Sequence, residues 1–142
     1  MSALKKPAYF CEGKIIASDL LIHLPPFKRR ELLKNLSLQE PELALDLLSL
    51  CTKLDDFAIL SDLEIREVVK YIHPAILGLA LKKCNTETQL TVLTLTPKAY
   101  GEEAFEILTM PMAPLDPYLQ KAEKKTLKLL LALHREGVIS LF

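Results

Sequence analysis

The chain has 142 residues, of which half are apolar and a quarter are charged, a composition typical of a folded domain that excludes a disordered chain. Lys and Arg together number 18, as do Asp and Glu, so the net charge gives no reason to expect binding to nucleic acid or to an anionic membrane. Three cysteines, Cys11, Cys51 and Cys84, stand far apart in the sequence. Their odd number indicates a reducing compartment and not a disulfide framework.

The sequence also gives no sign of export or of membrane insertion. The N-terminal stretch MSALKKPAYFCEG lacks the apolar run of a signal peptide. The longest apolar block, residues 127–133, is far shorter than the roughly 20 residues that span a bilayer. We therefore expect a cytoplasmic protein.

Hydrophobic periodicity predicts helix along almost the whole chain, and no segment has the alternation of a strand. The expected helices cover residues 13–24, 27–36, 40–51, 61–73, 74–83, 87–94, 97–108 and 117–136. In the first two helices, we expect the following residues to face inward: Ile15, Ile16, Leu20, Leu24, Phe27, Leu32, Leu33 and Leu36.

Capping residues and prolines mark the ends of these helices. Ser61 and Glu64 have the spacing of a capping box, and Thr86 and Gln89 repeat it. Thr96-Pro97 and Asp116-Pro117 each combine an N-cap residue with a proline at the first helical position. Gly137 ends the last helix, and we expect the apolar tail VISLF to pack back onto the body of the protein or onto a partner.

Short links between many helices favour antiparallel neighbours, so the predicted fold class is all-α, with armadillo-like stacked helices followed by a helical C-terminal unit. The expected organisation is an N-terminal arm (residues 1–12), a first helical unit (13–50), a linker or hinge (51–60) and a C-terminal helical domain (61–142).

No pattern of catalytic or metal-binding residues is present in the sequence. His23, His73 and His134 have no partners at metal-ligand spacing, and polar contacts at helix ends are the preferred interpretation. Cys51 and Cys84 are interpreted as small core residues and not as nucleophiles. We expect no enzyme activity, no cofactor, no metal and no small-molecule substrate, although an enzyme using Cys51 or Cys84 remains an alternative.

The helix at 117–136 is the strongest candidate for an interaction surface. One face carries leucines that suit packing on the body of the protein, and another groups Lys121, Lys124, Lys125 and Lys128. We expect this basic face to remain exposed and available to an acidic partner.

Several stretches together resemble one known family. EPELALDLL, LDDFAILSDLEIREVV, GLALKKC, LTPKAYGEE and HREGVISL follow one another in the order and spacing of segments of FliG, the switch and rotor protein of the bacterial flagellar motor. The resemblance runs from Gly13 to the end of the chain and covers the C-terminal half of the family's pattern. The family's N-terminal domain and its Glu-His-Pro-Gln motif have no counterpart.

The resemblance implies an all-α, armadillo-like protein whose work is assembly. In the family, helical units stack between neighbouring subunits to form a ring at the cytoplasmic face of the inner membrane, and a charged ridge meets the stator. It therefore implies protein partners, namely ring or basal-body components and further copies of the chain through stacking. Contact with the membrane would be indirect, through those partners.

The charged ridge of the family is only partly matched. Lys82 stands at the position of a ridge lysine, and Lys98 stands where the family has an arginine. The family's acidic pair falls on Phe105 and Glu106, so one charge is lost, while Glu102 and Glu103 lie a turn earlier. Opposed charges would act more weakly in such a ridge, so we do not expect full torque generation.

The family's hinge has the pattern Met-Phe-x-Phe, and Cys51, Thr52, Lys53 and Leu54 occupy those positions here. Because both aromatic residues are missing, we expect residues 51–60 to connect two helical units without acting as a tuned switch.

The leading hypothesis is therefore a FliG-like interaction scaffold in a flagellar switch or a type III secretion basal assembly. The alternative is a free-standing cytoplasmic adaptor or regulator that kept the fold but left the machine.

Overall fold

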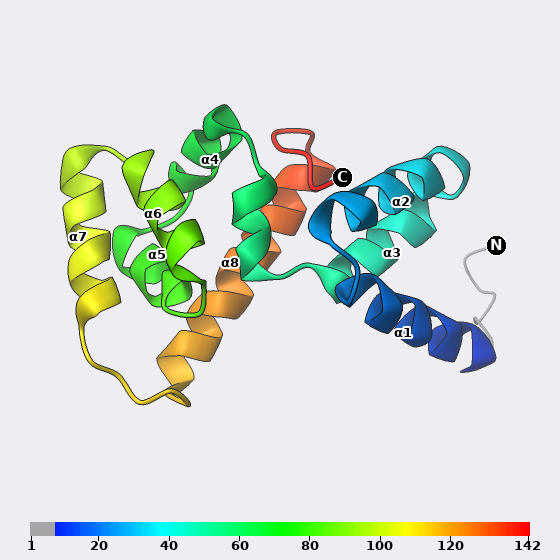
Figure 1. The fold of residues 1–142 in the computed structure, drawn as a ribbon, viewed down its shortest axis with the longest axis horizontal. Helices are drawn as coiled ribbons and strands as arrows, with labels where there is room; N and C mark the ends of the chain where they lie inside the picture. Colours follow the sequence, from blue (N-terminus) through cyan, green and yellow to red (C-terminus); the bar gives the residue numbers. More distant parts are fainter. Residues whose placement is uncertain (1–7) are drawn as a thin grey trace. The chain divides into compact units, whose positions relative to one another are not determined.

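The computed structural model describes residues 8–142, and their side chains from residue 13 onward. Within these residues the chain is all-α, as expected from the sequence, with eight α-helices, one 3₁₀ helix and no strand (Figure 1). The elements are α1 (Ala8–Ile22), α2 (Pro26–Gln39), α3 (Pro41–Cys51), η1 (Leu54–Ile59), α4 (Asp62–Val69), α5 (Pro74–Leu81), α6 (Thr86–Thr94), α7 (Lys98–Thr109) and α8 (Pro117–Arg135). Part of the expected N-terminal arm, residues 1–7, lies outside the described residues, and α1 already begins at Ala8.

The described chain divides into two compact units between Thr52 and Lys53. Unit 1 contains α1, α2 and α3, and α3 packs against both of the other helices. Its core is formed by Leu33, Ala44, Leu47 and Leu48, which are all buried. A partly buried ion pair between Lys14 on α1 and Asp46 on α3 adds to this packing.

Several inward-facing residues predicted for α1 and α2 lie at the surface instead. Ile15, Ile16, Leu20, Phe27 and Leu32 are all at least half exposed, whereas Leu33 is buried as expected. A unit of three short helices has a small core, so each of α1 and α2 buries only a narrow stripe. Helices α1 and α2 therefore contain more apolar residues than the small core of unit 1 can bury.

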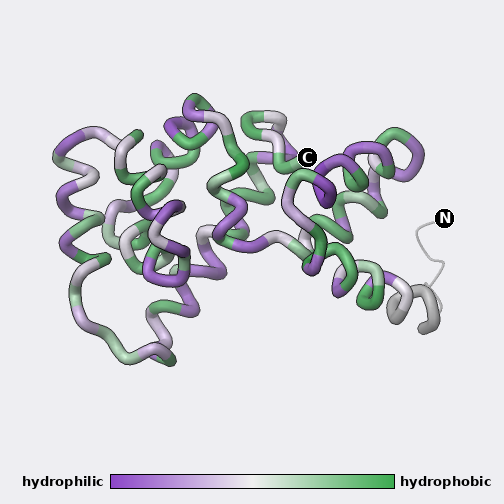
Figure 2. Tube along the Cα trace, in the orientation of Figure 1, coloured by the Kyte–Doolittle hydropathy of each residue, from purple (hydrophilic) through white to green (hydrophobic). Residues whose placement is uncertain are grey.

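Unit 2 contains η1 and helices α4 to α8, and α5 lies at its centre. Helix α5 packs against both α7 and α8, which places it between them (Figure 1). Phe57, Ile65, Leu77, Leu81 and Leu130 are among its largest fully buried side chains. Figure 2 shows hydrophilic and hydrophobic residues alternating along its helices, as expected where each helix buries one face.

Gly78 explains how closely α5 and α7 approach. A Cβ atom at this position would lie 2.5 Å from the backbone oxygen of Ala104 and 2.9 Å from the Cβ of Ile107. No real side chain could occupy that space without moving α7, so the absence of a side chain at Gly78 sets the distance between the two helices.

The predicted start of α4 and both predicted ends of α8 are confirmed, whereas α4 ends at Val69 and not at residue 73. Ser61 and Glu64 form the capping box at the start of α4, with the Glu64 backbone N–H donating to Ser61 Oγ at 3.2 Å and the Ser61 N–H donating to Glu64 Oε1 at 3.0 Å. Asp116 caps α8 by accepting a hydrogen bond from the Tyr118 N–H at 2.9 Å. Gly137 follows α8 with φ of 78°, a left-handed conformation that suits glycine.

Two other predicted caps are wrong. Helix α6 is capped by Asn85, whose Oδ1 accepts from the Thr88 N–H at 2.8 Å, and Thr86 is the first residue of the helix. Pro97 occupies the N-cap position of α7, which begins at Lys98. The hydroxyl of Thr96 makes no cap bond to α7; it donates to the carbonyl of Leu93 at the end of α6, at 2.7 Å.

The stretch predicted as a linker contains the 3₁₀ helix η1. Leu54 and Phe57 are buried within unit 2, and Asp56 accepts from the Lys53 N–H at 2.9 Å. Asp55 accepts from the Asn85 N–H at 3.1 Å and so ties η1 to the start of α6. The lack of glycine and proline in this stretch fits a packed segment that stays close to the core.

Candidate protein-binding surface on helix α7

Four of the predicted site residues share one helix, α7. Lys98, Glu102, Glu103 and Glu106 are all exposed there. Residues four apart lie on the same face of a helix, so Lys98, Glu102 and Glu106 form one row, with Glu103 beside it. The opposite side of α7 carries the buried Ala104 that packs against α5. The structure thus brings these charges together on the free face of a well-packed helix.

Lys82, which follows α5, lies at the C-terminal end of α7 and has a different role. It follows the end of α5 and is half-buried, and its Nζ donates to the carbonyl oxygens of Leu108, at 2.9 Å, and of Met110. The last carbonyls of a helix carry partial negative charge, so a cation there is favourable. Lys82 therefore uses its donors to close the C-terminal end of α7.

Phe105 is a surface feature that the sequence-based list of site residues left out. It is 55% exposed and lies on α7 between Glu102 and Glu106 in the sequence. Together with Leu90 and Leu93 it lines a groove of about 370 Å³ between α6 and α7, to which Lys98 and Glu102 also contribute. An apolar residue among glutamates on a charged helix face is the sequence signal that could have identified it.

The four predicted hinge residues lie at the division between the two units. Cys51 and Thr52 end unit 1, and Lys53 and Leu54 begin unit 2. The Thr52 hydroxyl donates to the Leu48 carbonyl at 2.5 Å, which continues the hydrogen bonding of α3. Cys51 and Leu54 are only 1% and 5% exposed. Cys51 and Leu54 are thus packed even though the aromatic residues of the family pattern are missing, whereas Lys53 is exposed.

The histidines and cysteines lie in structural positions. His73 caps α5, since its Nδ1 accepts from the Ala75 N–H at 3.1 Å, and His134 Nδ1 accepts from the Leu141 N–H at 3.1 Å. These bonds confirm polar contacts near helix ends for two of the three histidines. Burial, with smaller contributions from Asp55 and Glu123, raises the pKa of Cys84 to about 12. A nucleophilic cysteine needs the opposite shift.

Two kinds of feature, a metal-ligand cluster and a membrane-spanning helix, are absent from the described residues. No group of three or more His, Cys, Asp or Glu side chains in residues 13–142 has the geometry to hold a metal ion. None of the helices in the described part of the chain combines the length and the hydropathy needed to cross a bilayer.

Comparison with known proteins identifies the fold. A family model described as "FliG C-terminal domain" matches residues 34–141. A crystal structure of a FliG fragment from H. pylori is similar with a TM-score of 0.67 and 18% identity, over 100% of this chain and 61% of that chain. Full-length FliG from Aquifex aeolicus is similar with a TM-score of 0.59 and 22% identity, over 96% of this chain and 41% of that chain.

The chain thus spans less than two thirds of the length of either solved relative. At these identities the structural likeness shows the fold, whereas the family model shows the relationship. A comparison with curated protein sequences gave no match. The resemblance inferred from the quoted stretches of sequence is confirmed.

Proposed function

Because this chain belongs to the FliG C-terminal domain family, we propose that it is a protein–protein interaction scaffold in a flagellar switch or a type III secretion basal assembly. The observation that carries the proposal is the family match over residues 34–141, which contains α7 and its exposed charged face. A scaffold needs a firmly packed body that presents a free surface, and α7 combines a buried side with a row of charges.

The charged face of α7 is the proposed partner-binding surface, formed by Lys98, Glu102, Glu103 and Glu106. Lys82 supports this surface indirectly by closing the end of α7. Its ammonium group is engaged with backbone carbonyls, and Phe105 replaces one acidic charge of the family's ridge. Both features support a ridge with weaker opposed charges and hence a protein without full torque generation.

The remaining parts of the proposal concern organisation and location. Residues 51–60 join a first helical unit, with armadillo-like stacking, to the C-terminal domain, without acting as a tuned switch. The protein works in the cytoplasm, at the inner face of the inner membrane, where its partners hold it. The family relationship supports the organisation and the location, and Thr52 and Leu54 in place of the family's two aromatic residues support the absence of a tuned switch.

Co-purification from the native cells tests the proposal. The tagged full chain is expected to recover flagellar or secretion-apparatus proteins, and the variant Glu102→Lys/Glu106→Lys is expected to recover less of them. A matched variant on another exposed surface, Lys34→Glu, should recover them normally. Recovery of no component of either machine by the unaltered protein would contradict the proposal.

A free-standing adaptor is the second candidate, and the altered ridge favours it. An adaptor needs no stator contact, so an internally bonded Lys82 and an exposed Phe105 would be compatible with it. It predicts a discrete monomer or dimer in solution that recovers soluble proteins from outside both machines. Concentration-dependent growth into larger oligomers would argue against it.

A further inference from the structure

A second hollow lies on unit 2, between the end of α4 and the turn that joins α6 to α7. This α4/α7 cavity has a volume of about 660 Å³ and is larger than the groove beside Phe105. Cavities of this size are typical of binding sites for small molecules. All of the residues that line it belong to unit 2, so one folded unit contains the whole cavity.

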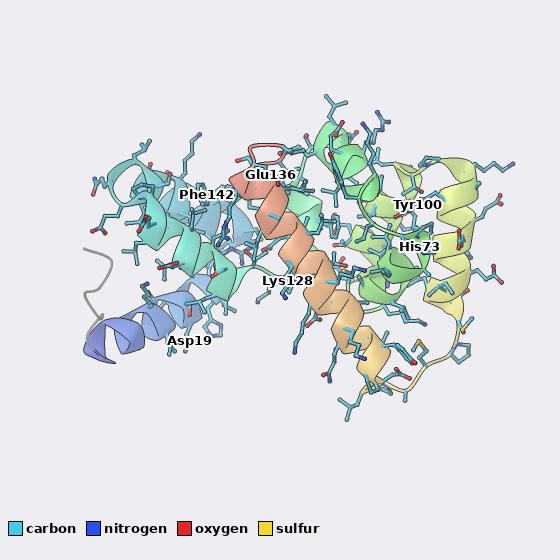
Figure 3. All side chains as sticks on the ribbon, turned by 180° about the vertical axis from the view of Figure 1, so that it is seen from behind. Asp19, His73, Tyr100, Lys128, Glu136 and Phe142 are labelled. Carbon is cyan, nitrogen blue, oxygen red and sulfur yellow. The ribbon has the colours of Figure 1, made fainter. Side chains whose placement is uncertain are left out.

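The floor of the cavity is apolar. Val69 and Ile72 line it from the end of α4, and each is only 7% exposed. Leu95 and Tyr100 line it from the side of α6 and α7. Tyr100 reaches back to the end of α4 (Figure 3), where its hydroxyl donates to the Ile72 carbonyl at 2.7 Å. This bond ties the two walls together, so the shape of the cavity is fixed by the packing of unit 2.

The hydroxyl groups of the lining have used their hydrogens inside the protein. Thr94 and Thr96 donate to carbonyls of α6 at 2.5 Å and 2.7 Å, and the Tyr100 hydroxyl donates to the end of α4. The lining contains no acidic side chain. The side chains of the lining that can donate to an occupant are therefore two cations, Arg66 and Lys70.

Arg66 and Lys70 form a cationic rim above the apolar floor. Both are exposed, and their spacing of four residues places them on the same face of α4. Within residues 13–142 no ion pair joins Arg66 to an acidic side chain. Lys70 binds Glu67 at 2.7 Å, which leaves two of its three N–H groups for an occupant.

The charges outside the lining do not reverse the sign of the rim. Burial, and then the charge of Glu103, raises the pKa of Tyr100, but Lys98 on the same helix carries the opposite charge to Glu103. Asp62 lies one helical turn before Arg66 and forms no ion pair with it. The end of α4 and the start of α7 meet at the cavity, so the opposite partial charges of their helix dipoles offset each other. The rim therefore favours an anion.

We infer that the α4/α7 cavity binds a small organic anion, in which one carboxylate or phosphate group is joined to an apolar body. The guanidinium group of Arg66 matches two oxygens of such a group, and Lys70 adds a second charge-assisted hydrogen bond. The apolar body lies against Val69, Ile72 and Tyr100, where it is removed from water. The inference goes beyond the proposed function and uses none of the residues of the charged face of α7.

A small molecule fits the cavity better than a macromolecule does. A stable protein interface buries about 800 Å² on each partner, whereas this site is a concave hollow with two charged side chains at its edge. Recognition of an anionic membrane takes a cluster of about four or more Lys or Arg residues. The chain's own residues 1–7 carry Lys5 and Lys6 and no acidic side chain, so the rim would repel them.

An NMR titration of the isotope-labelled full chain with naphthoate tests the inference. Saturable shifts are expected for the amide signals of Val69, Ile72, Leu95 and Tyr100, with a dissociation constant of about 1 mM or tighter for a ligand of this size. Naphthyl phosphate should bind at the same place. Naphthamide has the same shape without the charge, so it should bind about tenfold more weakly or worse. Acetate and inorganic phosphate should also bind more weakly, because they lack the apolar body.

A pair of matched variants separates the rim from the rest of the surface. Arg66→Gln/Lys70→Gln should weaken naphthoate binding by about tenfold or more, as expected for the loss of charge-assisted hydrogen bonds, and should leave the weaker binding of naphthamide unchanged. Arg135→Gln/Lys128→Gln makes the same two changes at exposed positions of α8 and should bind naphthoate like the unaltered protein. All four positions are exposed, so both variants should show the circular dichroism of the unaltered chain.

Three results would overturn the inference. The first is a chain that gives no saturable shift with naphthoate or naphthyl phosphate, including one that binds only an acidic peptide or anionic lipid vesicles. The second is a set of shifts that lies outside the cavity, for example along the exposed lysines of α8. The third is naphthamide binding as tight as naphthoate binding, or a loss of naphthoate binding in Arg135→Gln/Lys128→Gln equal to that in Arg66→Gln/Lys70→Gln. None of these results bears on the co-purification test of the scaffold, because the titration uses the purified chain alone.

Discussion

At the scale of single residues, Glu64 and His134 hold the C-terminal tail of unit 2. Glu64 completes the capping box through one carboxylate oxygen, and its other oxygen accepts from the Ser140 N–H at 2.6 Å. His134 accepts from the next N–H of the tail, that of Leu141. Ile139 and Leu141 are buried, so the tail packs back onto the body, as the sequence predicts, and two side chains fix its backbone.

The His134 bond predicts a pH-dependent stability. Burial, and then the charge of Arg135, lowers the pKa of His134 below its ordinary value of 6.5. Below pH 6.5 the unfolded chain thus binds more protons than the folded one, so stability is full above that pH. It should fall as the pH drops through 6.5, and level off below the folded pKa.

Urea unfolding at a series of pH values measures this effect. The variant His134→Gln should lose the part of the pH dependence that arises below pH 6.5. His23→Gln, the same substitution at an exposed position, is the matched control. An identical pH profile for His134→Gln and the unaltered protein would contradict the prediction.

A second prediction concerns Thr126, whose hydroxyl is buried without a hydrogen-bond partner in the described structure. Burying a hydroxyl without a partner costs free energy, so Thr126→Val should raise the free energy of unfolding by about 1 kcal/mol. Thr91→Val is the control, because the Thr91 hydroxyl donates to the Glu87 carbonyl at 2.9 Å and its loss should bring no gain. Denaturant unfolding of both variants would show whether the difference between them has this sign.

At the scale of secondary-structure elements, the site depends on how α5 and α7 pack. Helix α7 presents its charged face only because its other face is held firmly against α5, and Gly78 makes this close contact possible. Lys82 then fixes the end of α7 from the neighbouring helix. Two residues thus set the position of the charged face of α7. Gly78 allows the close packing on α5, and Lys82, which the sequence placed on the charged surface, holds the end of the helix.

Gly78→Ala should therefore destabilise unit 2. The added methyl group would lie 2.5 Å from the Ala104 oxygen, and crowding of this kind costs about 1–3 kcal/mol. Gly13→Ala is the matched control, since nothing lies within 4 Å of a Cβ at that position of α1, and it should stabilise by about 0.5–1 kcal/mol through helix propensity alone. Thermal unfolding would contradict the prediction if both variants were equally stable.

At the scale of the whole molecule, the chain consists of two units of unequal size that meet in the sequence between Thr52 and Lys53. Unit 2 has its own buried core around Phe57, Leu77 and Leu130. Unit 1 has three helices and a smaller core, and domains of this size are marginally stable alone.

A fragment of residues 53–142 should consequently fold by itself. It is expected to show a helical circular dichroism spectrum and one cooperative unfolding transition, because the large core of unit 2 is contained in it. A fragment of residues 1–52 should be much less stable, since its core is small. A fragment 53–142 that is unfolded in buffer would show that unit 2 needs the rest of the chain.

The sequence alone determined the all-α class, the start of α4, both ends of α8, and the family. Each of these depends on residues close together in the chain: Ser61 with Glu64, Asp116 with Tyr118, and quoted stretches whose order is itself a sequence property. The start of α5 at Pro74 follows from the proline for the same reason, whereas His73, expected to end the helix before it, is the N-cap of α5.

The tertiary structure alone decided which apolar and charged residues face solvent. Ile15 and Phe27 have core-type side chains but are exposed, because three short helices bury only a narrow stripe each, and Leu54 and Phe57 are buried in a stretch that was expected to be a linker. Lys82 was predicted as a surface charge, and its bonds to the end of α7 come from residues 26 and 28 positions away in the chain. Such contacts depend on how helices pack, which local spacing does not encode.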